Sequence, residues 1–352
     1  MIKLFTHTDL DGVGCAVLAK LAFGNDVEIE YCGYENIDER VLTFISEVRY
    51  DEVEAVYITD ISVSEDTAKL MEDTKYSDIV RLFDHHKTAE HLNKYDWCFV
   101  TEEIEGIKTC GTELFYKHLL ENDLIKNTER FKTFVWAVTM YDTWAWKKLD
   151  EEEGLMVKEL NDILYILGRD EFIDRRVRRK NVKGDDAMVA ASKDERLLLD
   201  QRQKEIDVYI NKKDGEIFFW PVNVENNFYK GQMIAGIVFA DRYISELGNT
   251  LCEKNIGCDF IMIVEPGARK VHYRTIKPNV DVSKIAATLG GGGHKAAAGH
   301  VFDSIVQDNI VRAILGVVTP DDMVYDAAPD KKVMEEVAEK KPWYKALFGG
   351  NK

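Results

Sequence analysis

The stretch HTDLDG, residues 7 to 12, comes directly after a short apolar run at the start of the chain. The apolar and β-branched residues of Ile2 to Thr6 predict a strand. In an extended chain His7, Asp9 and Asp11 alternate with period 2 and point the same way. Two carboxylates beside an imidazole favour a bound cation, although an Asx-type turn closed by the glycine gives the same residue pattern. This stretch alone therefore leaves a metal site and a turn as alternatives.

Strands and helices alternate in the segments that follow. We predict helices at 13–23, 37–48 and 64–74, and strands at 27–34, 54–60 and 79–83. This alternation predicts an α/β fold with a doubly wound parallel sheet, in which ligands bind beyond the carboxyl ends of the strands. Asp60 follows the third strand, and Asp84, His85 and His86 follow the fourth. Three strand ends thus deliver metal-type ligands to one edge, which favours the metal site.

The remainder of the chain predicts a second, smaller domain. Further helices are expected at 109–124, 129–144, 151–168 and 172–180, and a long charged helix at 188–211. Then come a strand at 216–224, a helix at 233–253, strands at 258–264 and 270–276 joined by a Glu-Pro-Gly turn, and a closing helix near 308–315. The expected organisation is a doubly wound parallel-sheet domain (1–187), a helical connector (188–214), a smaller α/β domain with a mixed sheet (215–318) and a peripheral tail (319–352).

Composition narrows the class of protein. The 352 residues are 45% hydrophobic, which is enough for two domains with their own cores. We find no apolar run of roughly 18 residues and no signal-peptide pattern, so we expect a cytoplasmic protein without a membrane partner. The formal net charge of −17 disfavours a protein that coats long nucleic acid and is compatible with a short substrate. Six scattered cysteines without a CxxC pair predict buried free thiols.

Two further stretches stand out. Residues 175–180 form a basic island in an acidic protein, and an ion-paired or solvated helix face is the default interpretation. Residues 289–300 read LGGGGHKAAAGH, where four successive glycines leave backbone N–H groups open to an anion or a nucleotide. We therefore favour a binding loop followed by a short, closely packed element over a flexible linker.

Five motifs in this order resemble the DHH phosphoesterase family with its associated C-terminal domain: HTDLDG (7–12), ITDIS (58–62), FDHH (83–86), YDTW (141–144) and GGGHKAAAG (291–299). The resemblance covers about residues 1–316. It implies two divalent metal ions, with manganese as the expected metal, although zinc or iron would bind the same donor set.

The resemblance also implies roles for individual residues. It gives one ion the ligands His7, Asp9 and Asp60, and the other ion the ligands Asp11, Asp60, His85 and Asp142, with Asp60 bridging. It gives Asp84 the task of orienting the histidines and lets His86 face the scissile phosphate. In the second domain it implies substrate contacts from Arg274, Gly291, Gly292, Gly293 and His294.

The reaction that the resemblance implies is hydrolysis of a phosphoester by metal-activated water. The compact two-domain layout most resembles the oligoribonuclease and nanoRNase branch, which degrades RNA fragments of a few nucleotides. We expect short RNA or DNA oligonucleotides or dinucleotides as the substrate of this chain. Cyclic-dinucleotide or phosphoadenosine-phosphate hydrolysis is the alternative activity. A catalytically inactive nucleotide-binding regulator is a further alternative, and a homodimer stays open.

Overall fold

The structure is a computed structural model that describes all residues except 226–229, 308–311 and 313–352. The chain forms two compact units, Met1–Asp200 and Gln201–Lys352, and the boundary falls inside helix α8 (Lys193–Glu216). The expected closing helix near 308–315 lies largely outside the described residues, and the expected tail 319–352 lies wholly outside them. No helix in the described part of the chain is both long enough and apolar enough to cross a membrane.

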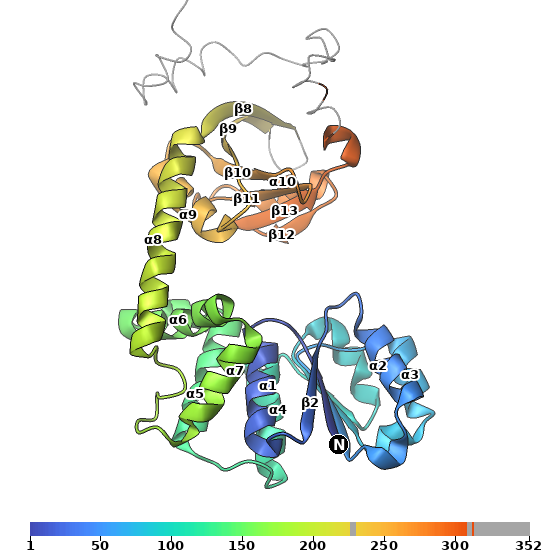
Figure 1. The fold of residues 1–352 in the computed structure, drawn as a ribbon. Coiled ribbons are helices and arrows are strands. Elements are labelled where there is room, and N and C mark those ends of the chain that lie inside the picture. Colours follow the sequence, from blue (N-terminus) through green and yellow to red (C-terminus); the bar gives the residue numbers. More distant parts are fainter. Residues whose placement is uncertain (226–229, 308–311, 313–352) are drawn as a thin grey trace, which may run out of the picture. The chain divides into compact units, whose positions relative to one another are not determined.

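The first unit is built on a five-stranded sheet in the order β2-β1-β3-β4-β5 (Figure 1). Its strands are β1 (Ile2–Thr6), β2 (Val27–Tyr31), β3 (Ala55–Thr59), β4 (Val80–Asp84) and β5 (Cys98–Val100). Every neighbouring pair is parallel. The predicted doubly wound parallel sheet is confirmed, and all its strands end at the edge where the acidic motifs begin.

Helices cover both faces of this sheet (Figure 1). One core lies beneath α1 (Leu10–Phe23), α4 (Gly111–Glu121), α5 (Glu129–Asp142), α6 (Glu151–Leu167) and α7 (Arg169–Arg178). The other lies beneath α2 (Ile37–Glu47) and α3 (Glu65–Glu72). Because both faces are covered, β1 is buried at all five positions, including those of its two polar residues, Lys3 and Thr6. A short hairpin, β6 (Glu103–Ile104) and β7 (Ile107–Lys108), precedes α4.

The second unit contains a six-stranded mixed sheet in the order β12-β13-β11-β10-β9-β8. The strands are β8 (Phe218–Glu225), β9 (Lys230–Phe239), β10 (Phe260–Glu265), β11 (Lys270–Arg274), β12 (Gly292–His294) and β13 (Ala297–Val301), with helices α9 (Ile244–Lys254) and α10 (Val282–Thr288). Among the described strands of this sheet, only β9 and β10 pair in parallel. The antiparallel pairing of β10 with β11 across the predicted turn is confirmed.

The helix predicted from residue 233 is wrong in its first part. Residues 233–239 belong to β9, and the helix begins only at Ile244. A buried strand in the middle of a sheet carries an uninterrupted apolar run, which periodicity cannot distinguish from a buried helix. The β-branched residues of this run and Gly236, which lies against the side chains of Ile217 and Ile261, suit a strand.

The basic island is an ion-paired face. Glu195, in the first turn of α8, lies 3.2 Å from the fully buried Arg176 and 2.9 Å from Arg179. Arg175 pairs with Glu171 and with Asp194. These contacts hold α7 to the start of α8, so the default interpretation is confirmed. All six cysteines are buried and free, as expected.

Candidate active site

The turn from β1 into α1 brings the first motif into the site. Asp9 caps the helix, because its carboxylate accepts a hydrogen bond from Gly12 N at 3.2 Å, and the helix begins at Leu10. Asp11 therefore reaches the site from the first turn of a helix, and the expected period-2 alternation through Asp11 is wrong. A Cβ at position 12 would lie 2.3 Å from the carbonyl oxygen of His7, so this close turn requires glycine.

The end of β3 and the start of α4 approach each other closely. Asp60 has a left-handed backbone with φ of 55°, and a Cβ at position 111 would lie 2.9 Å from its Cα. The N–H groups of Gly111 and Thr112 donate to the carboxylate of Asp11 at 2.7 and 2.8 Å. The first turn of α4 thus fixes the orientation of Asp11 and leaves room for Asp60.

The end of β4 is organised by Asp84, which is buried. Its Oδ1 accepts hydrogen bonds from the backbone N–H groups of His85 and His86 at 2.7 and 3.2 Å and lies 2.7 Å from His86 Nδ1. Its Oδ2 accepts a hydrogen bond from Ser62 Oγ at 2.5 Å. This network directs His86 Nε2 away from Asp84 and fixes the backbone that carries both histidines.

Two groups of potential metal ligands meet at Asp60. His7 Nδ1 lies 3.1 Å from Asp9 Oδ2 and 3.8 Å from Asp60 Oδ2. On the other side, His85 Nε2 lies 3.3 Å from Asp60 Oδ1, 3.6 Å from Asp142 Oδ2 and 3.7 Å from Asp11 Oδ2. The possible ligand atoms of His7, Asp9 and Asp60 lie within 4.8 Å of one another, and so do those of Asp11, His85 and Asp142. All six residues expected as metal ligands therefore come together, from four separate segments of the first unit.

The electrostatics of these groups fit divalent cations. His7 Nδ1, Asp60 Oδ2 and His85 Nε2 are buried and have no hydrogen-bond partner. Burial and the neighbouring charges of Asp11 and Asp9 raise the pKa of Asp60 well above its ordinary value. The same causes raise the pKa of Asp142 to about 8. Carboxyl groups this crowded cannot all ionise unless a positive charge lies among them, and imidazole with carboxylate is a common ligand set for transition metals.

One aromatic residue at this edge escaped the sequence analysis. Tyr34 lies in the loop after β2, and its hydroxyl is 3.1 Å from His86 Nε2. Its ring centroid lies 5.3 Å from that of His7. The loop is held by a hydrogen bond from Gly33 N to Asn36 Oδ1 at 2.9 Å. The sequence signal for Tyr34 is its position near the end of β2, but a phenol is not a usual metal ligand, so the ligand pattern does not include it.

The residues expected to contact substrate lie in the second unit. Arg274 ends β11, and its guanidinium donates to Tyr273 O at 2.9 Å and to Ser245 Oγ at 3.3 Å. Among the described residues no carboxylate lies within ion-pair distance of it. Arg274 in β11 and His294 in β12 are both register partners of Ala297 in β13, so they flank the same residue on one face of the sheet.

The glycine stretch forms part of a hairpin. A Cβ at position 291 would lie 2.1 Å from Gly299 O, and one at position 293 would lie 2.6 Å from Ala297 O. These two glycines therefore allow β12 to approach β13 closely. Gly292 is exposed, with open space where its Cβ would be. The expected binding loop followed by a closely packed element corresponds to this hairpin.

Comparison with known proteins gives a clear relative. No model of a known protein family matches the chain. It is 36% identical over 326 residues to the oligoribonuclease NrnB of Bacillus subtilis (strain 168), covering 91% of this chain and 78% of that protein.

Solved structures share the fold. RecJ from Thermus thermophilus in complex with Mn²⁺ has a TM-score of 0.54 and 15% identity, over 96% of this chain and 56% of that chain. An exonuclease RecJ bound to manganese has a TM-score of 0.52 and 15% identity, over 93% and 92% of the two chains. At this identity the likeness concerns the fold alone.

Proposed function

The chain belongs to the DHH family of phosphoesterases, and on this basis we propose that it hydrolyses short single-stranded oligonucleotides with two bound divalent metal ions. The observation that carries the proposal is the pair of ligand groups on either side of Asp60, with buried polar atoms that lack a hydrogen-bond partner. The name of the relative NrnB, an oligoribonuclease, supports the choice of substrate.

We propose that the two ions are manganese, bound by the two ligand groups described above. His7, Asp9 and Asp60 would hold one ion, and Asp11, Asp60, His85 and Asp142 would hold the other. When bound, such ions supply Lewis acidity that activates a water molecule and neutralises negative charge on phosphoryl oxygens. Burial alone would raise the pKa of Asp9, but the nearby imidazole and charge of His7, together with the hydrogen bond from Gly12 N, outweigh it and lower this pKa to about 2, so the carboxylate is ionised at neutral pH.

The remaining side chains of the first unit orient the substrate. The hydrogen bond between Asp84 and His86 Nδ1 raises the pKa of His86 and so favours its imidazolium form. A charged His86 would donate from Nε2 to an oxygen of the scissile phosphate, which stabilises the charge that develops there. The phenol of Tyr34, 3.1 Å from Nε2, keeps the ring in this orientation or donates to the same phosphate.

The second unit would bind the part of the oligonucleotide that does not react. A guanidinium binds phosphate bidentately, and Arg274 has no carboxylate partner within the described residues that would compete. His294 flanks the same strand position, and the exposed Gly292 leaves backbone open beside it. We therefore assign the neighbouring phosphate and its nucleoside to Arg274, His294 and the glycines 291–293.

A substrate panel tests this function. Labelled RNA and DNA of two to about twenty nucleotides, cyclic di-AMP, cyclic di-GMP and phosphoadenosine phosphate would be incubated with the full chain and manganese. We expect the highest kcat/KM for oligonucleotides of two to five residues. We expect no hydrolysis after chelation, full recovery on adding manganese, and a folded but inactive Asp60→Asn variant.

The possible outcomes distinguish the metal mechanism, the choice of substrate and the catalytic activity itself. Activity that persists in chelator after metal stripping would overturn the metal mechanism. A higher kcat/KM for a cyclic dinucleotide or for phosphoadenosine phosphate would overturn the substrate while leaving the family intact. No hydrolysis of any member, together with tight nucleotide binding, would indicate an inactive regulator.

A further inference from the structure

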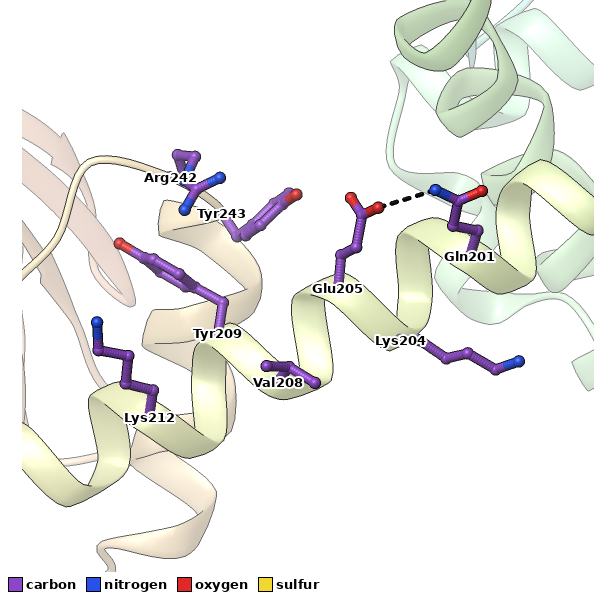
Figure 2. A pocket seen from close by; sticks show the side chains of 8 residues that line it. All are labelled: Gln201, Lys204, Glu205, Val208, Tyr209, Lys212, Arg242 and Tyr243. Carbon is purple, nitrogen blue, oxygen red and sulfur yellow. Dashed lines mark hydrogen bonds between the residues drawn. The ribbon is translucent and has the colours of Figure 1, made fainter.

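The second unit has a pocket that the proposed active site does not use. It lies between α8 and the segment that precedes α9, and its volume is about 500 Å³ (Figure 2). We call it the tyrosine pocket, after the two aromatic residues in its wall, Tyr209 of α8 and Tyr243 just before α9. Figure 2 shows both rings and Arg242 on the same side of α8.

The two tyrosines form a fixed aromatic corner. Their ring centroids are 5.6 Å apart, and their planes meet at 76°. The Tyr209 hydroxyl donates to Asp241 Oδ1 at 3.0 Å and accepts from Asp241 N at 3.3 Å, which holds its ring in place. Tyr243 has a left-handed backbone with φ of 53°, an uncommon conformation for an aromatic residue. Both side chains are half-buried, so part of each is open to solvent.

Cationic side chains surround this corner. The guanidinium of Arg242 lies 5.0 Å from the Tyr209 ring and 5.9 Å from the Tyr243 ring, and that of Arg202 lies 5.6 Å from the Tyr243 ring. Lys212 lines the same pocket.

Each of the two exposed cations has one carboxylate near the limit of ion-pair distance: Asp241 is 3.9 Å from Arg242, and Glu216 is 3.8 Å from Lys212. Arg202 has no carboxylate within ion-pair distance among the described residues. Among the residues that line the pocket, the cations Lys204, Lys212 and Arg242 outnumber the one carboxylate, Glu205, so the wall carries a net positive charge in a chain of net charge −17.

A ligand that suits such a wall combines a flat ring with negative charge. Bases stack on aromatic side chains and on guanidinium planes, and nearby lysine and arginine neutralise phosphate. A cluster that only fastened α8 to the rest of its unit would bury these groups. Instead, Arg242 and Lys212 are exposed, and Val208 in the pocket wall is 70% exposed.

We propose that the tyrosine pocket is a second nucleotide site, in which one base stacks on the tyrosines and its phosphate binds Arg242 and Lys212. The nucleotide is either free or one unit of an oligonucleotide that the chain binds. The second source rests on the proposed function.

Binding to the full chain in chelator tests the pocket without hydrolysis. The probes are a fluorescein-labelled pentanucleotide, followed by anisotropy, and unlabelled AMP, followed by calorimetry. The variants are Arg242→Glu, which reverses an exposed charge, and Tyr243→Asn, which removes the ring with a residue that tolerates the left-handed backbone. Lys270→Glu is the matched control, because it makes the same charge change at an exposed position of β11.

We expect Arg242→Glu and Tyr243→Asn to weaken binding of the pentanucleotide, of AMP or of both by roughly 5- to 100-fold, the range typical of one stacked base. Lys270→Glu should change it less than twofold. Loss of AMP binding in the variants identifies a free nucleotide, and loss confined to the pentanucleotide identifies a unit of a strand. Equal weakening by Arg242→Glu and Lys270→Glu would overturn the proposal, as would unchanged binding by Tyr243→Asn.

Hydrolysis of bis-p-nitrophenyl phosphate with manganese provides the second readout. All three variants should retain it, because the metal ligands belong to the first unit. The binding assay needs no turnover, so an enzyme that fails to cleave oligonucleotides would still report on the pocket. The two proposals therefore fail separately.

Discussion

Replacing Asp142 by asparagine should stabilise the metal-free protein while abolishing its activity. Asp142 ends α5, and its side chain is 22% exposed. Burial and the negative charges of Asp11 and Asp9 raise its pKa from 3.8 to about 8. The native state of the metal-free protein therefore keeps a proton on Asp142 that the unfolded state loses above pH 3.8.

The size of the effect follows from this difference in pKa. Below pH 3.8 both states are protonated, and the substitution changes the free energy of unfolding little by this route. As the pH rises to 7, the wild type loses stability over about three pH units, at about 1.4 kcal/mol per unit, which gives an upper value of about 4 kcal/mol. Asparagine has no proton to lose, so the variant avoids this loss. The titration of Asp142 depends on the charges of Asp11 and Asp9, and protonation of either carboxylate would reduce the measured gain.

Urea unfolding in chelator at pH 4 and at pH 7 measures the effect. The variant should match the wild type at pH 4 and exceed it at pH 7. Manganese at a hundredfold its dissociation constant should raise the free energy of unfolding of the wild type by about 2.7 kcal/mol and that of the variant by less. The difference in stability between the two proteins should therefore shrink or change sign. A variant that is less stable than the wild type at pH 7 in chelator, or one whose advantage is equal at both pH values, would refute the reasoning.

Three further results are expected. The kcat/KM of a di- to pentanucleotide should exceed that of a twenty-nucleotide strand, because a chain of net charge −17 offers little surface to a long polyanion; the reverse order in the same assay would contradict this. Arg274→Ala and His294→Ala should lower kcat/KM for oligonucleotides, Arg274→Ala by roughly 30- to 4,000-fold, and should leave hydrolysis of bis-p-nitrophenyl phosphate nearly unchanged. An equal loss on both substrates would show that these residues support the fold or the metal site. Tyr34→Phe should lower the single-turnover rate about tenfold, which corresponds to the loss of one hydrogen bond of about 1.4 kcal/mol, and should leave the melting temperature unchanged. An unchanged rate would show that Tyr34 does not take part in the reaction.

The sequence predicted the location of the site because topology constrains it strongly. In a parallel sheet the carboxyl ends of neighbouring strands meet at one edge, so the position of Asp60 and His85 after β3 and β4 was enough to bring them together. The route of each side chain into the site was less predictable. Asp11 reaches the site because Asp9 caps helix α1, so the chain is already helical at Asp11. This capping hydrogen bond is local, and an alternating residue pattern does not reveal it.

Other features depend on contacts that no local pattern records. Residues 233–239 of β9 look the same as a buried helix in sequence, and only the pairing with β8 and β10 decides between a strand and a helix. Tyr34 gains its importance from a loop closed by Asn36 and from a distance of 3.1 Å to His86, which lies 52 positions further along the chain. A tyrosine after a strand is common, and its neighbour in space is set by the complete fold.

The close approach of Gly111 to Asp60 has a consequence for how relatives of this chain should be compared. A survey of genomes that scores only the acidic and imidazole positions would count as active any homologue in which those positions are intact. Yet a methyl group at position 111 would collide with the backbone of Asp60, and one at position 12 would collide with that of His7. The two glycines are thus as informative as the ligands for judging whether a homologue is active. A homologue can lose its activity through a substitution at either glycine while all its ligands are retained.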